Sequence, residues 1–180
     1  MAMKTKLRGE RIGLMTVDPG RTTGVTISQP LLTGNVTEIF ERDTLHVFQI
    51  NCQDTSVPEP ETEVPGTLDL LGEYQDAEKE WLDAGIPYSH HHLVIEDFIL
   101  RGKLGGTERS GLSPVRVGSG LMVGLRLEGH KPHIHFQQAS DAKGVATNER
   151  LKSWGLWTRG LEHGRDATRH AVLFVRRSMA

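Results

Sequence analysis

Five stretches of the chain are rich in apolar and β-branched residues over lengths typical of β-strands. In the first pair, the runs IGLMTVD and TGVTIS are separated only by the turn sequence PGRT. The fourth run, LVIEDFIL, is interrupted only by Glu96 and Asp97. The predicted strands cover residues 12–18, 23–28, 44–50, 93–100 and 132–138.

Apolar residues at helical spacing predict helices that alternate with the later strands. One face of the first helix carries the apolar residues Leu71, Tyr74, Ala77 and Trp81. Thr67 is the expected cap of this helix, and its end is marked by Gly85 and Pro87. The predicted helices cover residues 68–84, 114–128, 147–154 and about 163–177. Strands followed by alternating helices and strands predict an α/β fold with a mixed sheet, as a single domain over residues 1–180.

Residues 51–66, NCQDTSVPEPETEVPG, contain three prolines and four acidic residues with almost no apolar side chain to bury. This composition predicts a solvated, acidic, proline-rich loop. We expect it to lie away from a bound polyanion.

The charge of the chain is unevenly distributed. Residues 1–97 contain 7 Lys+Arg and 17 Asp+Glu, a net charge of −10, whereas residues 98–180 contain 14 and 6, a net charge of +8. The second half is thus basic enough to meet a polyanion, although solvated surface charge is the alternative. The single cysteine excludes an internal disulfide, and neither a secretory signal nor a membrane-spanning run is visible, so we expect a cytoplasmic protein.

Three carboxylates occupy positions that suit a ligand site. Asp18 ends the first strand, Glu96 lies in the fourth, and Asp166 begins the last helix with His163 three residues earlier. Ligands of open α/β sheets bind beyond the carboxyl ends of strands, and carboxylates brought together there would repel one another unless a cation neutralised them. Few, hard oxygen ligands suit Mg²⁺ or Mn²⁺. Turn chemistry at Asp18 and a helix-dipole role for Asp166 remain alternatives.

The nine histidines suggest a second metal site less strongly. His133 and His135 alternate on one strand face, but no third ligand lies near them in the sequence, which disfavours zinc. The run His90–His92 is expected to be an exposed segment that leads into the fourth strand.

The sequences VDPGRTTG, IEDF and HGRDA, in this order, resemble the RuvC family of Holliday-junction resolvases in the RNase H-like superfamily, whose members occur in bacteria and phages; a phage-type member is one reading. The resemblance spans roughly residues 12–177. It implies a five-stranded mixed sheet flanked by helices and a homodimer that cuts branched DNA, such as four-way junctions, with two Mg²⁺ or Mn²⁺ ions per site. It also implies that Asp18, Glu96 and Asp166 bind the metals, with His163 beside them as a catalytic residue or further ligand.

The basic residues after the second acid are the expected DNA contacts, together with one lysine that follows the fifth strand. They are Arg101, Lys103, Arg109, Arg116 and Lys143. Many resolvases place an aromatic residue three positions after the second acid, where this chain has Ile99; the nearby Phe98 is expected to pack in the core.

Helix 114–128 is the expected dimer interface. Val115, Leu121, Met122 and Leu125 make it more apolar than a surface helix requires, and Gly120 with Gly124 would let a partner helix approach. Burial of this helix against the sheet is the alternative.

Two other functions remain open: an RNA-processing nuclease on the same fold, and a nucleotide-binding module, since DPGRTTG also resembles the phosphate loop of actin-like ATPases.

Overall fold

Within the residues that the computed structural model describes (7–41, 45–58, 61–98 and 112–180), five strands form one mixed sheet in the order β3-β2-β1-β4-β5. The pairs β1–β2 and β2–β3 are antiparallel, whereas β1–β4 and β4–β5 are parallel. The strands are β1 (Gly13–Asp18), β2 (Thr22–Ser28), β3 (His46–Asn51), β4 (His91–Glu96) and β5 (His133–Gln137). The predicted mixed five-stranded sheet is confirmed.

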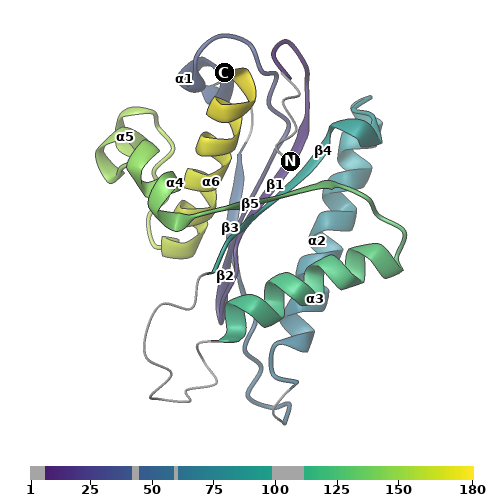
Figure 1. Cartoon of the computed structure of the whole chain (residues 1–180). Helices are drawn as coiled ribbons and strands as arrows, with labels where there is room; N and C mark the ends of the chain where they lie inside the picture. The colour runs from purple at the N-terminus through teal and green to yellow at the C-terminus, as the bar shows by residue number, and fades with distance from the viewer. Residues whose placement is uncertain (1–6, 42–44, 59–60, 99–111) are drawn as a thin grey trace.

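Helices cover both faces of the sheet (Figure 1). Helices α2 (Val64–Asp83) and α3 (Ser113–Leu127) pack on one face, and α6 (Glu162–Met179) packs on the other, beside α4 (Ala139–Val145) and α5 (Asn148–Ser153). Thr147 caps α5, because its Oγ1 accepts a hydrogen bond from the amide of Arg150. The short helices α1 (Val36–Glu41) and α4 were not predicted, since six or seven residues carry little helical periodicity.

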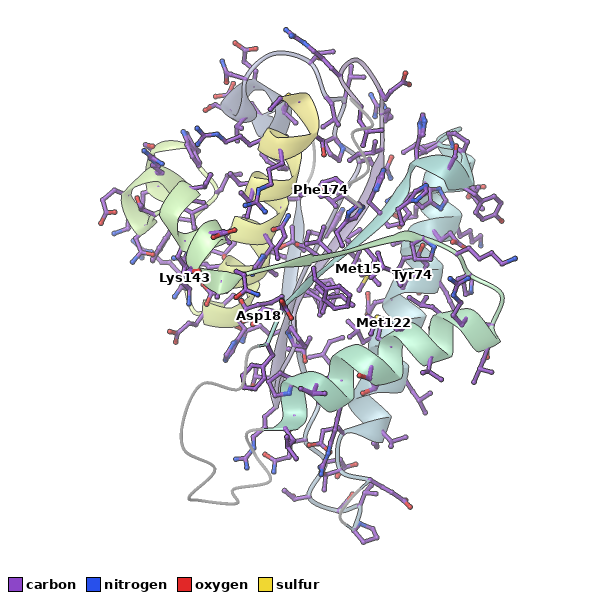
Figure 2. The ribbon with its side chains drawn as sticks, viewed as in Figure 1. Met15, Asp18, Tyr74, Met122, Lys143 and Phe174 are labelled. Atoms are coloured by element: carbon purple, nitrogen blue, oxygen red, sulfur yellow. The ribbon has the colours of Figure 1, made fainter. Side chains whose placement is uncertain are left out.

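Alternation along the strands divides the core into two layers. Met15 and Val17 point toward α2 and α3, and Leu14 points toward α6. Figure 2 shows Met15, Tyr74 and Met122 on the α2–α3 side, with Phe174 in α6 across the sheet. None of the helices in the described ranges combines the length and the apolar character that crossing a bilayer requires.

Helix α6 is held unusually close to the sheet. Thr16 Oγ1 donates to the carbonyl of Ala167 at 2.7 Å, and the hydroxyls of Thr26 and Thr168 lie 3.0 Å apart. Gly24 makes this approach possible, because a Cβ there would fall 2.0 Å from the carbonyl oxygen of His163. The first turn of α6 therefore rests directly on β2 beside Asp18, whose register partner is Gly24.

The two glycines of α3 contact the same chain rather than a second copy. A Cβ at Gly120 would lie 2.9 Å from Thr67, and one at Gly124 would lie 3.0 Å from Leu71, both in α2. Leu121 and Leu125 are fully buried in the core beneath the helix. The glycine strip is thus an internal α2–α3 contact, and its prediction as the approach surface for a partner helix is wrong.

The predicted solvated loop at 51–66 is anchored at both ends. Cys52 is fully buried, and its amide donates to the carbonyl of Arg21 at 2.7 Å in the turn that follows Asp18. At the other end α2 already begins at Val64, so Thr67 lies inside the helix rather than capping it. The loop follows β3 at the same sheet edge as Asp18, and its position relative to a bound polyanion stays a prediction.

Candidate active site

Two carboxylates lie at the ends of neighbouring parallel strands. Asp18 ends β1 and Glu96 ends β4, and these strands pair in parallel, so both residues lie at the same edge of the sheet. Thr16 and Val94, two positions earlier in their strands, contact α6 and its core, so both carboxylates point to the α6 face. The structure therefore brings these two predicted site residues to the same edge and the same face of the sheet.

Asp18 is a buried carboxylate in an unfavourable electrostatic setting. It is only 8% exposed. Burial, and next the nearby charge of Glu96, raise the pKa of Asp18 to about 6, although a hydrogen bond with His163 opposes the shift. His163 Nδ1 lies 2.9 Å from Asp18 Oδ2, and its ring is about half exposed. A cation next to this carboxylate would relieve the repulsion between the two acids.

Glu96 has a histidine partner that was not predicted from the sequence. His170 Nε2 lies 2.9 Å from Glu96 Oε2, and His170 Nδ1 lies 3.1 Å from Gln137 Oε1. His163, Asp166 and His170 recur at spacings of three and four along α6, so they share one helix face. That spacing was the signal in the sequence that could have identified His170.

Asp166 lies on the same helix face, but its carboxylate is engaged by basic residues. Lys143 Nζ lies 3.1 Å from Asp166 Oδ2, and Arg169 donates to Asp166 Oδ1. The buried Arg169 also donates to Asn148 and to the carbonyl of Ala146. A polar pocket of about 450 Å³ opens here, lined by Lys143, Thr147, Asn148, Glu149, Glu162, Arg165, Asp166 and Arg169.

The three predicted acids are near one another without meeting at a point. The charge of Asp166 raises the pKa of Asp18 less than burial and Glu96 do. Among the described residues, no three histidine, cysteine or acidic side chains are arranged so that they could hold a metal ion. The donor set nevertheless fits a hard divalent cation, because Asp18 and Glu96 offer oxygens whose mutual repulsion a cation would remove. Asp166 would have to exchange Lys143 or Arg169 for that cation.

The predicted DNA-contacting residues have different outcomes. Lys143, labelled on α4 in Figure 2, lies beside Asp166. Its side chain is more than half exposed. Arg116 forms an ion pair with the buried Glu63, Nη1 to Oε2 at 3.3 Å, which neutralises part of its charge, and its role as a DNA contact stays a prediction. The remaining three lie outside the described residues: Arg101, Lys103 and Arg109.

The Glu63 carboxylate explains why Arg116 is held. It accepts hydrogen bonds from Ser113 Oγ at 2.5 Å and from Thr62 Oγ1 at 3.0 Å. Burial alone would raise its pKa, but these hydrogen bonds and the charge of Arg116 lower the pKa of Glu63 below its usual value. Glu63 therefore ties the acidic loop to the first turn of α3.

Phe98 is 39% exposed, so the expectation that it packs in the core is wrong. Strand β4 ends at Glu96, and the alternation that would have buried Phe98 ends with it. Ile99, where resolvases place an aromatic residue, lies outside the described residues.

The histidine run is not an exposed segment, because β4 begins at His91 and both His91 and His92 are buried. His92 joins His133 and His135 on the α6 face of the sheet, with its Nδ1 3.1 Å from His135 Nε2. The rings of His92 and His133 stack instead of converging, and the described residues offer no three-ligand metal site.

Comparison with known proteins gives a structural likeness only. No protein-family model and no curated protein sequence matches the chain. Among solved structures, RuvC of Thermus thermophilus is similar both in complex with a Holliday junction substrate (13% identity) and in a second structure (14% identity). Both have a TM-score of 0.55, and each match covers 94% of this chain and 98% of the other. The chain therefore has the RNase H-like fold of the RuvC type.

Proposed function

We propose that this protein is a metal-dependent nuclease that cuts branched DNA such as four-way junctions. The observation that carries the proposal is the buried Asp18 beside Glu96 at the ends of paired parallel strands, each with a histidine partner from α6. The solved RuvC structure with a similar fold is in complex with a Holliday junction substrate, which supports the choice of DNA.

Asp18, Glu96 and Asp166 would hold Mg²⁺ or Mn²⁺, two ions per site, with His163 as a further ligand or catalytic residue. Bound there, the metal would supply charge stabilisation for the phosphodiester and an acidified water. The carboxylate of Asp18 only accepts, so His163 donates its Nδ1–H and keeps a lone pair on Nε2. The half-exposed ring can then accept a proton from the attacking water.

Arg169 and Lys143 have separate roles in this proposal. Arg169 is buried and bonded to Asp166, Asn148 and the carbonyl of Ala146, so it holds the first turn of α6 against the α4–α5 connection. Lys143 is exposed and keeps its ammonium near Asp166, where a DNA phosphate would lie next to the acids.

The test is cleavage of a matched set of labelled substrates by the wild-type protein with Mg²⁺, with Mn²⁺ and with EDTA. The set contains a four-way junction, a flap, a linear duplex and an RNA–DNA hybrid of the same sequence. We expect metal-dependent cuts in the junction at a rate at least about tenfold above the duplex. Preferred cleavage of the hybrid would instead support the RNA-processing alternative, and no cleavage of any substrate would contradict the proposal.

We also propose that the protein acts as a homodimer. A four-way junction has two-fold symmetry, so cutting two of its strands symmetrically requires two active sites related by the same symmetry, one in each subunit. Gly120 and Gly124 of α3 face α2, so they cannot contact a second subunit. We therefore place the dimer interface on the outer surface of α2 and α3. Most of the exposed large apolar side chains in the described ranges lie there. They are Val64, Leu68 and Leu82 in α2, and Val115, Val123 and Leu127 in α3.

We expect Val123→Lys to convert the dimer to a monomer, because Val123 is 58% exposed and a lysine there places a charge in the interface without disturbing the core. Light scattering after size exclusion would report the mass. Leu31→Lys, on an exposed apolar residue outside these helices, is the control and should leave the mass unchanged. A wild-type chain that remains monomeric with and without junction DNA would contradict the dimer.

A further inference from the structure

His170 lies in α6 and is buried against the ends of β4 and β5, next to the candidate site. The residue is 1% exposed, and its two ring nitrogens face Glu96 and Gln137, which are register partners on β4 and β5. The contacts are 2.9 Å to Glu96 Oε2 and 3.1 Å to the amide of Gln137, itself buried. Direct hydrogen bonds of His170 therefore link α6 to β5 and to the Glu96 carboxylate.

The chemistry of the three groups fixes the direction of one hydrogen bond. The ionised carboxylate of Glu96 can only accept, so His170 Nε2 must carry a proton and donate it. If the ring is neutral, Nδ1 accepts from the amide nitrogen of Gln137; if the ring is charged, Nδ1 donates to the amide oxygen. The amide of Gln137 can serve either state, and in both of them Nε2–H donates to Glu96.

The two histidines on this face of α6 differ in what they can do. His163 is about half exposed, so it can exchange a proton with solvent. His170 is sealed from solvent and bonded at both nitrogens, so it can orient its partner but cannot pass a proton to water. This difference separates a catalytic role for His163 from a supporting role for His170.

We propose that His170, itself oriented by Gln137, is a positioning residue that fixes the carboxylate of Glu96 for divalent-cation binding. Its hydrogen bond occupies Oε2 and restricts rotation of the carboxylate, so that Oε1 would be available to a cation. The inference rests on the proposed nuclease function and assigns a role within that site. Outer partners of metal-binding side chains typically change metal affinity by 10- to 100-fold.

The experiment compares His170→Leu with His170→Gln. Leucine removes the donor, whereas the glutamine amide can place an N–H near the former Nε2. We expect His170→Leu to weaken Mn²⁺ binding at least about tenfold, measured by calorimetry without DNA, and His170→Gln to remain within about threefold of the wild type. In cleavage assays at fixed Mn²⁺, kcat should fall while the Kd for junction DNA stays constant.

His135→Leu is the matched control. His135 lies on the same sheet face and packs against His92 and Phe174, but it makes no contact with Glu96 among the described interactions. It should change thermal stability without changing Mn²⁺ affinity. If His170→Leu does not fold, Gln137→Leu replaces it, because the loss of the amide frees the His170 ring to turn and should weaken Mn²⁺ binding in the same direction.

An NMR measurement on the metal-free protein tests the contact itself. The Nε2–H proton of His170 should give a slowly exchanging signal that Glu96→Leu shifts or removes, and the absence of that signal in the wild type would overturn the inference. Unchanged Mn²⁺ affinity in folded His170→Leu, with a wild type that binds and cleaves, would also overturn it. A wild type that binds no Mn²⁺ and cuts no substrate would overturn the proposed function, and this inference with it.

Discussion

Replacing Asp18 by Asn should abolish cleavage of junction DNA and, at neutral pH, make the metal-free protein more stable. The amide keeps the shape of the side chain but removes the charge that a divalent cation would bind, so a loss of about 10³-fold in kcat is expected from about 4 kcal/mol of lost transition-state stabilisation. Cleavage of a four-way junction under single-turnover conditions measures the first effect. Wild-type turnover by Asp18→Asn would contradict the site assignment.

The gain in stability follows from the pKa of Asp18. Burial, with the charge of Glu96, raises this pKa from 3.8 to about 6, so the folded state binds the proton more tightly than the unfolded state. The ionised form therefore destabilises the fold at pH 7 by about 3 kcal/mol, because 6 minus 3.8 is about 2 pKa units at 1.36 kcal/mol each. This contribution disappears as the pH falls from about 6 to about 4.

Urea denaturation in EDTA at pH 7 and pH 4 would measure the stability effect. The free energy of unfolding of Asp18→Asn should exceed that of the wild type by about 2–3 kcal/mol at pH 7, with the difference much reduced at pH 4. Glu128→Gln, at an exposed carboxylate after α3, is the control and should change little at either pH. A less stable Asp18→Asn protein at pH 7 would show that the buried charge is not a source of strain.

The elements that the sequence predicted best are those whose pattern is local. Alternating β-branched residues around the PGRT turn and the apolar run before Glu96 sufficed for the central strands. Short α4 carries too few turns for a periodic signal. The end of the acidic loop is less solvated than predicted, because Glu63 is buried beside Ser113 and Arg116, some 50 residues away. Contacts of that kind are invisible to composition.

The candidate site likewise contains residues that a local sequence pattern predicts and residues whose role depends on contacts between distant segments. Asp18 and Glu96 could be predicted because a carboxylate in an otherwise apolar strand is costly without a purpose. His170 appeared as one more polar position in α6, and its meaning depends on Gln137 and Glu96 lying opposite each other in the sheet. The engagement of Asp166 by Arg169 and Lys143 likewise needs the packing of α4 against α6.

Gly24→Ala should disrupt the site, because among the glycines that the structure describes an added Cβ comes closest to another atom at Gly24. The added Cβ would lie 2.0 Å from the carbonyl oxygen of His163 and 2.6 Å from the amide nitrogen of Gly164. Both are backbone atoms in the first turn of α6, so no side chain can rotate to make room. Helix α6 must move away from β2, which breaks the contact of His163 with Asp18 and strains that between Thr26 and Thr168.

We expect this substitution to lower the free energy of unfolding by about 3 kcal/mol or more, at the upper end of overpacking effects, and to reduce cleavage in whatever protein still folds. Gly72→Ala is the matched control, since Gly72 lies within α2 with no atom inside 4 Å of a new Cβ. That variant should be stabilised by up to about 1 kcal/mol, because alanine favours a helix over glycine. Urea denaturation of both proteins, with cleavage assayed below the unfolding transition, would separate the two cases. Equal stability of Gly24→Ala and the wild type would mean that α6 can leave the sheet edge without cost, and that the close approach of His163 to Asp18 does not depend on a bare backbone at Gly24.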